Sequence, residues 1–286
     1  MEALKRIAAV NDISGVGKCS ITVALPVISA SGVECALLPT ALLSTHTGGF
    51  EGYTFKDLTD EMLPIAQHWK NEKIPFDGVY SGYLATAEQA KTLEAVIELL
   101  ATPATKIIVD PVMADNGEYY CNHGDEMCAG FKRLCARADI ITPNITEAAL
   151  LTGLPYKNAP HNAEYIDALL GGLGALCHGI IAITGVSFDN KSLGVVALDS
   201  KTGERCFFSR PTAPGVFCGT GDIFASAFSA LMLRGAGLSA ATETAVSLVG
   251  DSIERTVLRN DPRRMGVDFE GALAAYVSKV AAMFAD

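Results

Sequence analysis

Short apolar segments alternate with longer helix-like segments along the first two thirds of this chain, and this alternation limits its fold more than any other feature. The segments 7–10, 78–81, 106–110 and 179–183 are mostly apolar and lack the polar alternation of a half-exposed strand. Such strands belong to sheets that are covered on both faces. Strands that alternate with helices form right-handed β-α-β units. The pattern therefore predicts an α/β protein, a three-layer α/β/α sandwich with a mainly parallel central sheet.

The other segments extend this prediction. Strands are also predicted at 33–38 and 139–142, and residues 192–198 and 204–208 are typical of a hairpin. Helices are predicted at about 18–30, 58–69, 125–137 and 162–176, near 86 and 146, and in three segments after residue 219. Thr86 and Gln89 have the spacing of a capping box. No repeat or Pro/Ser-rich linker interrupts the chain, so residues 1–286 are predicted to form one domain.

The charge balance and the length of the apolar segments narrow the range of partners. The 286 residues include 22 Lys and Arg against 32 Asp and Glu, a formal net charge of -10. This charge argues against a nucleic acid partner, although backbone amides and one metal ion can still bind a phosphate group. No apolar segment reaches the roughly 18 to 20 residues that span a bilayer. The apolar segment after Lys5 and Arg6 is too short for a secretory signal, so a cytoplasmic protein without membrane partners is predicted.

Polar residues follow most of the predicted strands. In open parallel sheets, ligands bind beyond the carboxyl ends of the strands. Any one of these positions could simply be a turn, but together they predict a ligand site along one edge of the sheet. The residues in question are Asn11-Asp12, Ser44-Thr45-His46-Thr47, Ser81-Gly82-Tyr83, Asp110-Pro111, Thr142-Pro143-Asn144 and Thr184.

The sequence Gly219-Thr220-Gly221-Asp222 stands directly before the apolar helical segment 223–233. Two glycines let the backbone turn its amides outward, and the helix that follows adds positive potential at the same point. This arrangement would bind an anion and would place Asp222 to accept a proton from an attacking hydroxyl group. The alternative is an ordinary glycine-rich helix start with Asp222 near the cap.

A second pair of polar residues follows the strand predicted at 139–142. Asn144 and Glu147 are three residues apart, and Asp110 ends the neighbouring predicted strand. Oxygen ligands of this kind suit magnesium, which bridges nucleotide phosphates while it keeps several waters. The alternative is a helix N-terminus in which Glu147 favours the helix dipole.

The segment 12–20 resembles a Walker A phosphate-binding loop but does not match it. That motif needs a glycine five residues before Gly17 and a serine or threonine after Lys18. Asp12 and Cys19 occupy these places. We therefore do not predict a P-loop, and Gly15 and Gly17 are expected to turn the first strand into its helix.

Neither a zinc site nor a disulfide is predicted. The spacing C-x-H-x4-C-x6-C of Cys121, His123, Cys128 and Cys135 fits no standard set of zinc ligands. The eight cysteines include no C-x-x-C pair and are predicted to be reduced thiols. The polar and aromatic segment 115–120 could be a mobile flap that shields a site from water, or a surface loop.

These motifs together resemble those of the ribokinase-like superfamily and, within it, the pyridoxal kinases. The resemblance runs from about Lys5 to the C-terminal helix, and the motifs occur in the order in which the family has them. The motifs are Pro39-Thr40 with His46-Thr47, Ser81-Gly82-Tyr83-Leu84, the segment 110–117, Thr142-Pro143-Asn144 with Glu147, and Gly219-Thr220-Gly221-Asp222.

The resemblance implies an enzyme that uses ATP to phosphorylate the 5'-hydroxymethyl group of pyridoxal, pyridoxine and pyridoxamine in vitamin B6 salvage. It implies Mg2+ and usually a monovalent cation such as K+, and it makes Asp222 the general base. Gly219, Thr220 and Gly221 would form the anion hole. Glu147, through water and with Asp110 nearby, would hold the Mg2+.

The resemblance also assigns residues to the two ligands. Thr142, Asn144, Thr184 and Arg210 would line the ATP site with Asp110 and Glu147, and the flap with Asp115 and Tyr120 would close over it. His46, Thr47 and Tyr83, together with Asp222 and either Asn11 or Asp12, would hold the pyridine ring. Members of this family are commonly homodimers, so a homodimer is expected.

The chain departs from the family at the end of the first strand, where pyridoxal kinases usually carry serine and this chain has Asn11. A hydroxymethylpyrimidine kinase of thiamine synthesis is therefore an alternative, although many of those relatives carry cysteine in place of Asp222. A non-catalytic pyridoxal-binding protein is a second alternative. Sugar kinases of the superfamily have a small β lid, whereas residues 47–57 are predicted to form a loop. An aldehyde substrate could also add to Cys121 in the flap.

Overall fold

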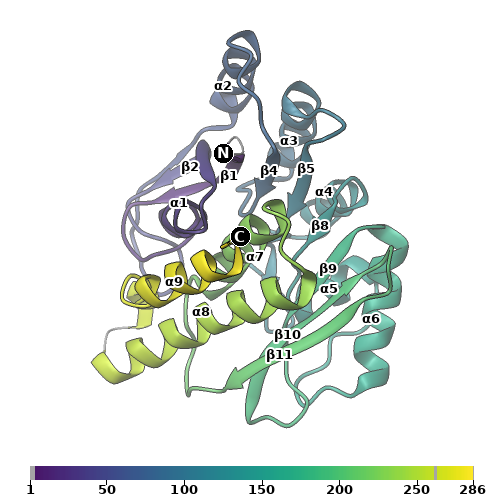
Figure 1. Cartoon of the computed structure of the whole chain (residues 1–286). Helices are drawn as coiled ribbons and strands as arrows, with labels where there is room; N and C mark the ends of the chain where they lie inside the picture. Colours follow the sequence, from purple (N-terminus) through teal and green to yellow (C-terminus); the bar gives the residue numbers. More distant parts are fainter. Residues whose placement is uncertain (1–3, 261–262, 286) are drawn as a thin grey trace.

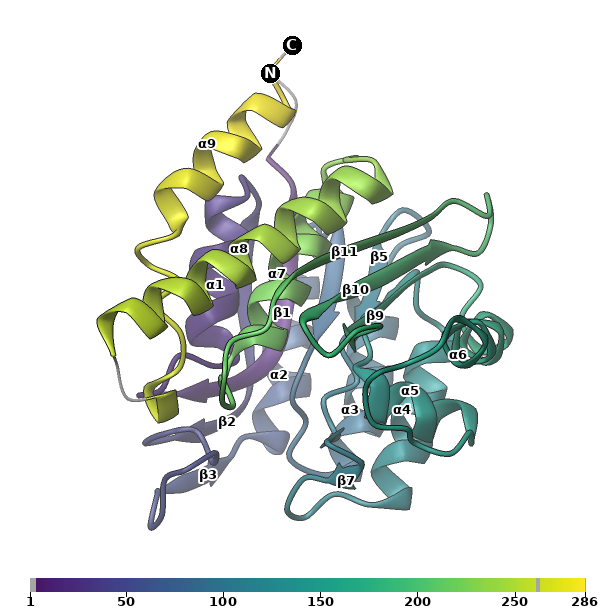
Figure 2. The same ribbon diagram turned by 90° about the horizontal axis from the view of Figure 1, so that it is seen from below.

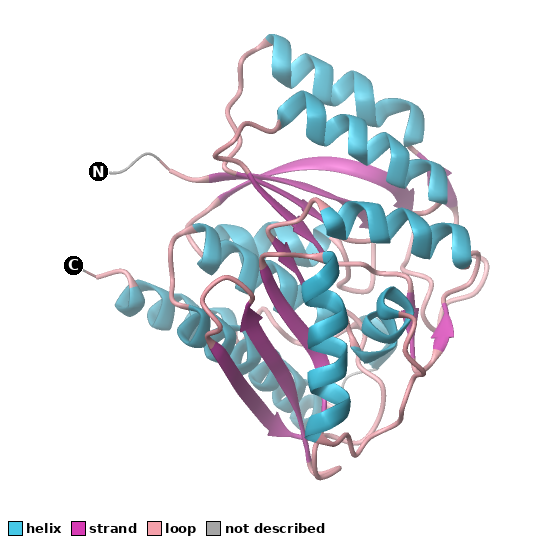
Figure 3. Cartoon of the chain, turned by 90° about the vertical axis from the view of Figure 1, so that its right-hand side faces the viewer, coloured by secondary structure: helices cyan, strands magenta, loops and turns pink. Residues whose placement is uncertain are grey.

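A mainly parallel sheet runs through the protein between two layers of helices (Figures 1 and 3). The computed structural model describes residues 4–260 and 263–285. Over these residues the main sheet has nine strands in the order β11-β10-β9-β8-β5-β4-β1-β2-β3. The six strands from β9 to β2 are parallel, whereas β3, β10 and β11 pair in antiparallel fashion at the two edges. The predicted three-layer sandwich is confirmed.

The apolar segments form the central strands, as their composition predicts. The parallel strands are β2 (Glu34–Leu43), β1 (Arg6–Ser14), β4 (Gly78–Ser81), β5 (Lys106–Val109), β8 (Ile140–Ile141) and β9 (Ile180–Val186). The edge strands are β3 (Phe55–Asp57), β10 (Ser192–Asp199) and β11 (Arg205–Pro211), and the last two form the predicted hairpin.

The helices divide into two layers, each with its own apolar core (Figure 2). Side chains along β1 alternate between the cores: Ala8 and Val10 pack into one, and Ile7 and Ala9 into the other. This explains why the strand is apolar at every position. One core includes α2 (Thr59–Asn71), α3 (Ala87–Leu100), α4 (Asp125–Ala136), α5 (Ile145–Thr152) and α6 (Ala163–Leu176). The other includes α1 (Ile21–Ala30), α7 (Thr220–Leu233), α8 (Leu238–Arg259) and α9 (Leu273–Met283), and a 3-10 turn spans Arg263–Met265.

The start of α3 has the cap that its sequence predicts. The Thr86 hydroxyl accepts a hydrogen bond from the Gln89 amide at 3.3 Å. The Gln89 side chain accepts one from the Ala85 amide at 2.8 Å, one residue before the cap. These bonds satisfy N–H groups at the helix start.

Several predictions about strands were wrong. β9 continues to Val186, so Thr184 lies inside it, and β2 continues to Leu43 instead of ending at residue 38. β1 continues to Ser14 instead of ending at residue 10, because its parallel pairing with β2 extends from Arg6 to Ser14. Asn11 and Asp12 therefore lie inside the strand and not after it. The segment 47–57 is also not entirely a loop, since β3 pairs with the end of β2. A strand of three residues is too short to show a period in the sequence.

The helix predicted from about residue 18 begins only at Ile21. Gly17, Lys18 and Ser20 have φ angles of 117°, 54° and 56°, which are incompatible with a right-handed helix. The three predicted C-terminal helices are present, and part of the predicted break at 260–266 lies outside the described residues. Within the described residues, no helix is both long and apolar enough to cross a membrane.

Candidate active site

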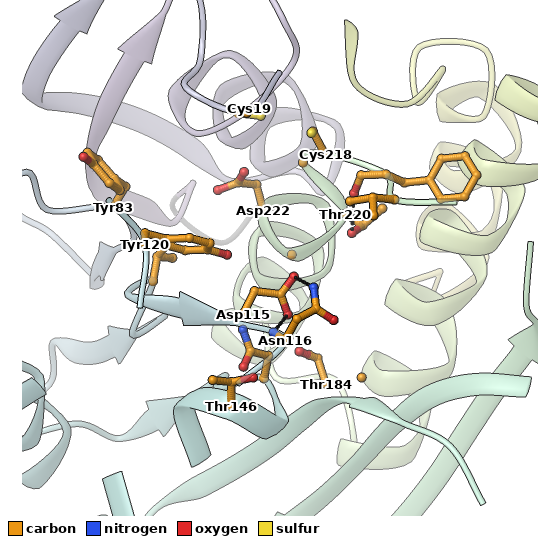
Figure 4. Close-up of a pocket in the computed structure, with 18 of the residues that line it drawn as sticks. Cys19, Tyr83, Asp115, Asn116, Tyr120, Thr146, Thr184, Cys218, Thr220 and Asp222 are labelled. Atoms are coloured by element: carbon orange, nitrogen blue, oxygen red, sulfur yellow. Dashed lines mark hydrogen bonds between the residues drawn. The ribbon is translucent and has the colours of Figure 1, made fainter. Parts of the chain in front are cut away.

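A cavity of about 2460 Å³ opens at the edge of the sheet where the parallel strands end (Figure 4). Residues from nearly every strand end meet there with the start of α7 and the last half of α8. Of the residues to which the sequence assigned a catalytic or binding role, Asn11 alone is absent from its lining. Several of the other polar residues after the predicted strands are also absent, namely Ser44, Thr45, Ser81, Gly82, Pro111 and Pro143. The lining includes Asp12, His46, Thr47, Tyr83, Asp110, Asp115, Tyr120, Thr142, Asn144, Glu147, Thr184, Arg210, Gly219, Thr220, Gly221 and Asp222.

Asn11 lies beneath the cavity and links two strands. Its side chain is fully buried, and its Oδ1 atom accepts hydrogen bonds from the amides of Tyr83, at 2.8 Å, and Asp12, at 3.1 Å. A Cβ atom at Gly82 would come within 2.3 Å of Nδ2, the side-chain nitrogen of Asn11, so a larger residue would displace the Asn11 side chain. Asn11 thus supports the site from below, and Asp12 is the neighbour that faces the cavity.

The start of α7 has the glycine turn from which the sequence predicted an anion site. Gly219 precedes the helix in the left-handed conformation, with φ of 80°. A Cβ atom there would lie 2.2 Å from the Lys18 carbonyl oxygen, so no other residue fits without movement. The first-turn amides of a helix have no partner within it and favour an anion. Thr220 and Gly221 continue this turn, and the Thr220 hydroxyl donates to the Phe217 carbonyl at 3.2 Å.

Asp222 lies in the first turn of α7 and faces the cavity (Figure 4). Burial and the charge of Asp12 raise its pKa to about 6, against the opposing effect of hydrogen bonding with the Ser20 backbone and the Asn11 side chain. A carboxylate with this pKa is mostly ionised at neutral pH and still binds a proton readily. Asp222 therefore has the chemistry of a general base beside an anion-binding turn.

Asp110 and Glu147 form a second acidic centre, only 5% and 3% exposed. Burial and the charge of Asp222 raise the pKa of Asp110 to about 8, although a hydrogen bond with Thr142 opposes this shift. Burial and the charge of Asp110 raise the pKa of Glu147 as well. Neither carboxylate forms an ion pair with a basic side chain among the described residues. A divalent cation would offset this uncompensated charge, so the pair fits a magnesium ion.

Glu147 is held by the start of α5. Its two carboxylate oxygens accept hydrogen bonds from the amides of Met113, at 3.1 Å, and Asn144, at 2.8 Å. In return the Asn144 side chain accepts from the Glu147 amide at 2.9 Å, which completes a capping box. The pair therefore caps a helix, as the alternative interpretation expected, and the magnesium site stays a prediction. Within the described residues, no group of three or more His, Cys, Asp and Glu side chains could hold a metal by itself.

The segment predicted as a flap or surface loop is a small hairpin at the rim of the cavity. Strands β6 (Ala114–Asp115) and β7 (Glu118–Tyr119) are joined by Asn116 and Gly117, whose φ angles of 52° and 85° are typical of a tight hairpin turn. The hairpin is fixed to the start of α5, because the Asn144 side chain donates to the Ala114 carbonyl at 2.7 Å and the Gly117 amide donates to the Thr146 hydroxyl at 3.0 Å.

An apolar slot between α8 and the edge hairpin was not predicted from the sequence. It is lined by Leu193, Val246, Val249, Ile253 and Val257. The four residues of α8 recur at intervals of three or four, a periodic signal that could have been recognised. The same period is typical of a helix face that is buried by packing, so the sequence does not distinguish the two.

Arg210 and Thr184 lie near this slot. Arg210 reaches back to α8, where its guanidinium lies 2.8 Å from Asp251 and 3.7 Å from Glu254. A Cβ atom at Gly250 would come within 2.7 Å of the Arg210 side chain, so the small residue leaves room for it. The Thr184 amide donates to the Pro143 carbonyl at 2.9 Å, next to the bridge that joins Thr184 to Asn144.

The other end of the cavity is aromatic. Tyr83 stacks on His123, with ring centroids 5.4 Å apart and an interplanar angle of 25°. His123 follows the flap hairpin, and its Nε2 atom lies 3.0 Å from the Leu84 carbonyl. No motif in the sequence predicts this contact, because His123 stands out there only for its spacing from the nearby cysteines. The stacked His123 ring thus fixes the orientation of the Tyr83 ring, and it connects Tyr83 to the flap region.

His46 closes this end of the cavity and connects it to the C-terminal part of the chain. Its Nδ1 atom accepts from the Gly48 amide at 3.0 Å. Its Nε2 atom lies 2.6 Å from the Arg264 carbonyl and donates to it. Lys18 also turns toward the C-terminal part, where its ammonium lies 3.0 Å from Glu270 and does not line the cavity. A Walker A lysine would point to the phosphates, so the geometry argues against a P-loop.

The eight cysteines are free thiols. Cys19 and Cys218 flank Asp222 (Figure 4), and burial raises the pKa of both thiols. Cys121 is exposed and lines the cavity beside the flap.

Comparison with known proteins assigns the chain to a family. A model of the phosphomethylpyrimidine kinase family matches residues 20–263. A Bacteroides thetaiotaomicron protein, named provisionally as a phosphomethylpyrimidine kinase, is 34% identical with a TM-score of 0.91, and its structure covers 96% of this chain and 94% of its own. A second crystal form of that protein contains pyridoxal.

Two further relatives are named as vitamin B6 kinases. Pyridoxal kinase from Lactobacillus plantarum is 30% identical with a TM-score of 0.88, over 98% of this chain and 99% of its own. A pyridoxine/pyridoxal/pyridoxamine kinase from Bordetella avium is 29% identical over 280 residues, or 86% of each chain. The expected ribokinase-like fold is confirmed by these structures. Since the family model matches most of its length, this chain belongs to the phosphomethylpyrimidine kinase family.

Proposed function

We propose that this protein is a kinase that transfers the γ-phosphoryl group of ATP to the 5'-hydroxymethyl group of pyridoxal, pyridoxine and pyridoxamine. The observation that carries the proposal is Asp222, a carboxylate with a pKa of about 6 in the first turn of α7, directly after the left-handed Gly219. The names of the Lactobacillus and Bordetella relatives, and the pyridoxal bound to the Bacteroides protein, support the same substrate class.

The proposed reaction follows from the two groups at the start of α7. The substrate oxygen attacks the γ-phosphorus while Asp222 accepts the hydroxyl proton, and the bond from phosphorus to the oxygen of ADP breaks. The amides of Gly219, Thr220 and Gly221 offset the charge on the transferring group. Because these amides are fixed by the helix, they need no reorganisation during transfer.

Asp110 and Glu147 would hold Mg2+, with Glu147 acting through water. Bound there, the metal ion would neutralise charge on the ATP phosphates. The two carboxylates fit this role because both are buried without a basic partner. A monovalent cation such as K+ is also proposed, on the resemblance alone.

The rest of the cavity divides between the two ligands. We assign the apolar slot beside α8 to the adenine ring, and Thr142, Asn144, Thr184 and Arg210 to the rest of the nucleotide. Asp115 and Tyr120 of the flap would cover the phosphates. His46, Thr47 and Tyr83 would hold the flat substrate ring, for which an aromatic wall is suited.

Phosphorylation of hydroxymethylpyrimidine is the second candidate, because the family model and the Bacteroides protein carry that name. A non-catalytic pyridoxal carrier is less well supported, since a carrier has no use for a base beside an anion-binding turn. One domain spanning residues 1–286, a homodimer and a cytoplasmic location are further proposals that follow from the resemblance and the sequence.

ATP consumption by the purified protein with Mg2+ and K+ tests these alternatives. Pyridoxal, pyridoxine, pyridoxamine, hydroxymethylpyrimidine and ribose are compared at equal concentration. We expect the highest kcat/KM on a B6 vitamer. A higher value on the pyrimidine would move the function to thiamine synthesis with the same mechanism, and ligand binding without turnover would support the carrier.

A further inference from the structure

Asp12 is a buried acidic residue that the proposed transfer of phosphate does not use. It lies inside β1, lines the cavity and is 4% exposed. The pairing of β1 with β2 shifts register between Asn11 and Ile13, so that Asp12 lies opposite two residues of β2, Thr40 and Ala41. Such irregularities often redirect a side chain next to an active site.

The chain provides Asp12 with hydroxyl partners but no cation. Its Oδ2 atom accepts a hydrogen bond from the Ser14 hydroxyl at 2.8 Å, and Ser20 also favours its charged form. Burial raises the pKa of Asp12, and the charge of His46 opposes this shift without forming an ion pair with it. Both ring nitrogens of His46 are bonded to backbone groups, and Lys18 is paired with Glu270. Asp12 forms no ion pair within the described residues. A buried charge without a partner favours a ligand of opposite charge.

The position of Asp12 relative to the base indicates where that ligand charge would lie. Ser20 connects Asp12 to the base, because its side chain bonds to the Asp12 carboxylate and its backbone to Asp222. Asn11 connects it to the aromatic wall, because its Oδ1 atom accepts from the amides of both Asp12 and Tyr83. On the pyridine ring of a B6 vitamer, the group at position 4 is adjacent to the 5-hydroxymethyl group. Of the two ring orientations that bring the hydroxymethyl group to Asp222, one turns the 4-substituent toward Asp12 and the other turns the unsubstituted position 6 toward it.

We propose that the Asp12 carboxylate binds the protonated aminomethyl group of pyridoxamine and so selects the amine-bearing vitamer over its neutral relatives. The inference rests on the proposed function. The aldehyde of pyridoxal and the alcohol of pyridoxine carry no charge at this position, whereas the primary amine is protonated near neutral pH. A charge-assisted hydrogen bond is stronger than a neutral one, and the bond to Asp12 would be largely shielded from solvent.

The test compares kcat/KM for pyridoxamine and pyridoxine in the wild-type protein and in Asp12→Asn. The asparagine keeps the shape of the side chain and an oxygen that can accept from Ser14. We expect the ratio of the two kcat/KM values, pyridoxamine over pyridoxine, to fall about tenfold or more in the variant. Glu51→Gln is the matched control, because Glu51 is an exposed carboxylate at the mouth of the same cavity, and its ratio should stay unchanged.

A second measurement does not depend on how the variant folds. Calorimetric titration of the wild-type protein should show pyridoxamine binding about tenfold more tightly than 4-deoxypyridoxine, which replaces the aminomethyl group by methyl. Equal affinities would overturn the inference, and so would a kcat/KM ratio that Asp12→Asn leaves unchanged while both kcat/KM values fall. Asp12 would then only hold Ser14 in place at the end of β1. No turnover of any B6 vitamer by the wild-type protein would instead reject the proposed function and this inference together.

Discussion

At the scale of single residues, the environment of Asp222 sets its reactivity. An exposed aspartate is too weak a base to accept a proton efficiently near neutral pH, whereas burial raises the pKa of Asp222 to about 6. The sequence pointed to this residue because the glycines before it are a local signal, and Asp222 does line the cavity. It could not predict the shift, which comes from Asp12 and from burial by distant elements.

Asp222→Asn should lower kcat about 10²- to 10⁴-fold, because a general base typically contributes that much. ATP binding, measured by calorimetry, should change little. In the wild-type protein kcat should fall as the pH drops below about 6, where Asp222 becomes protonated, and this acidic limb should disappear from the residual activity of the variant. Asp60→Asn, on the exposed face of α2, is the control. A rate near that of the wild type would exclude Asp222 as the base.

His123 shows what a sequence alone does not reveal. Its stacking on Tyr83 joins residues that are 40 positions apart, and no sequence motif predicts this contact. His123→Ala should raise the KM for the vitamers about 2- to 10-fold with little change in kcat, since the Tyr83 ring loses an aromatic contact. His123→Phe should restore most of the KM. Equal effects of the two substitutions would show that the hydrogen bond to Leu84, and not the stacking, matters.

At the scale of secondary structure, the elements that obey one local rule were predicted well. The start of α3 and the buried strands β4 and β5 follow from a cap and from apolar composition. The predicted bounds were wrong where strand pairing or backbone angles determine the end of an element. β1 extends to Ser14 because β2 continues beside it, and α1 starts late because Lys18 and Ser20 are left-handed.

The flap hairpin gives a test at this scale. Gly117 has φ of 85°, and a Cβ atom there would lie 2.8 Å from the Tyr156 ring. Gly117→Ala should distort the turn, at a local cost of about 1 to 2 kcal/mol. If the flap covers the phosphates, the KM for ATP should rise several-fold while the KM for the vitamer stays the same. Gly171→Ala, at an exposed helical position in open space, is the matched control, and an unchanged KM for ATP would reject the flap's role.

At the scale of the whole molecule, the sandwich was predictable because strands buried on both faces need helices on both sides. The sequence predicted that a ligand site lies along one edge of the sheet, but not the shape of the cavity. Its closure at His46 depends on the backbone of Arg264, more than 200 residues away, and its apolar slot depends on how α8 lies against the edge hairpin. Such contacts arise from packing and have no period in the sequence.

The buried carboxylates should also govern how stability depends on pH. Burial raises the pKa of Asp110 to about 8 and that of Asp222 to about 6. The folded state therefore binds more protons than the unfolded state, so the free energy of unfolding should fall as the pH rises from about 4 to 8. Added Mg2+ should offset this loss and raise Tm at pH 8 by several degrees.

Differential scanning calorimetry at several pH values with and without Mg2+ would measure this effect. Asp110→Asn with Glu147→Gln should remove the response to Mg2+ and flatten the decline with pH. A rise in Tm with Mg2+ that persists in the double variant would place the metal elsewhere.

The link between Lys18 and Glu270 also bears on how the protein is made. The loop after β1 forms early in synthesis, yet its Lys18 and the nearby His46 are held by Glu270 and Arg264. A growing polypeptide that stops before residue 264 lacks both contacts, even though Asp222 has already been added. Catalytic competence should therefore appear late and abruptly as the polypeptide grows on the ribosome, and a partly made chain should not consume ATP in the cell.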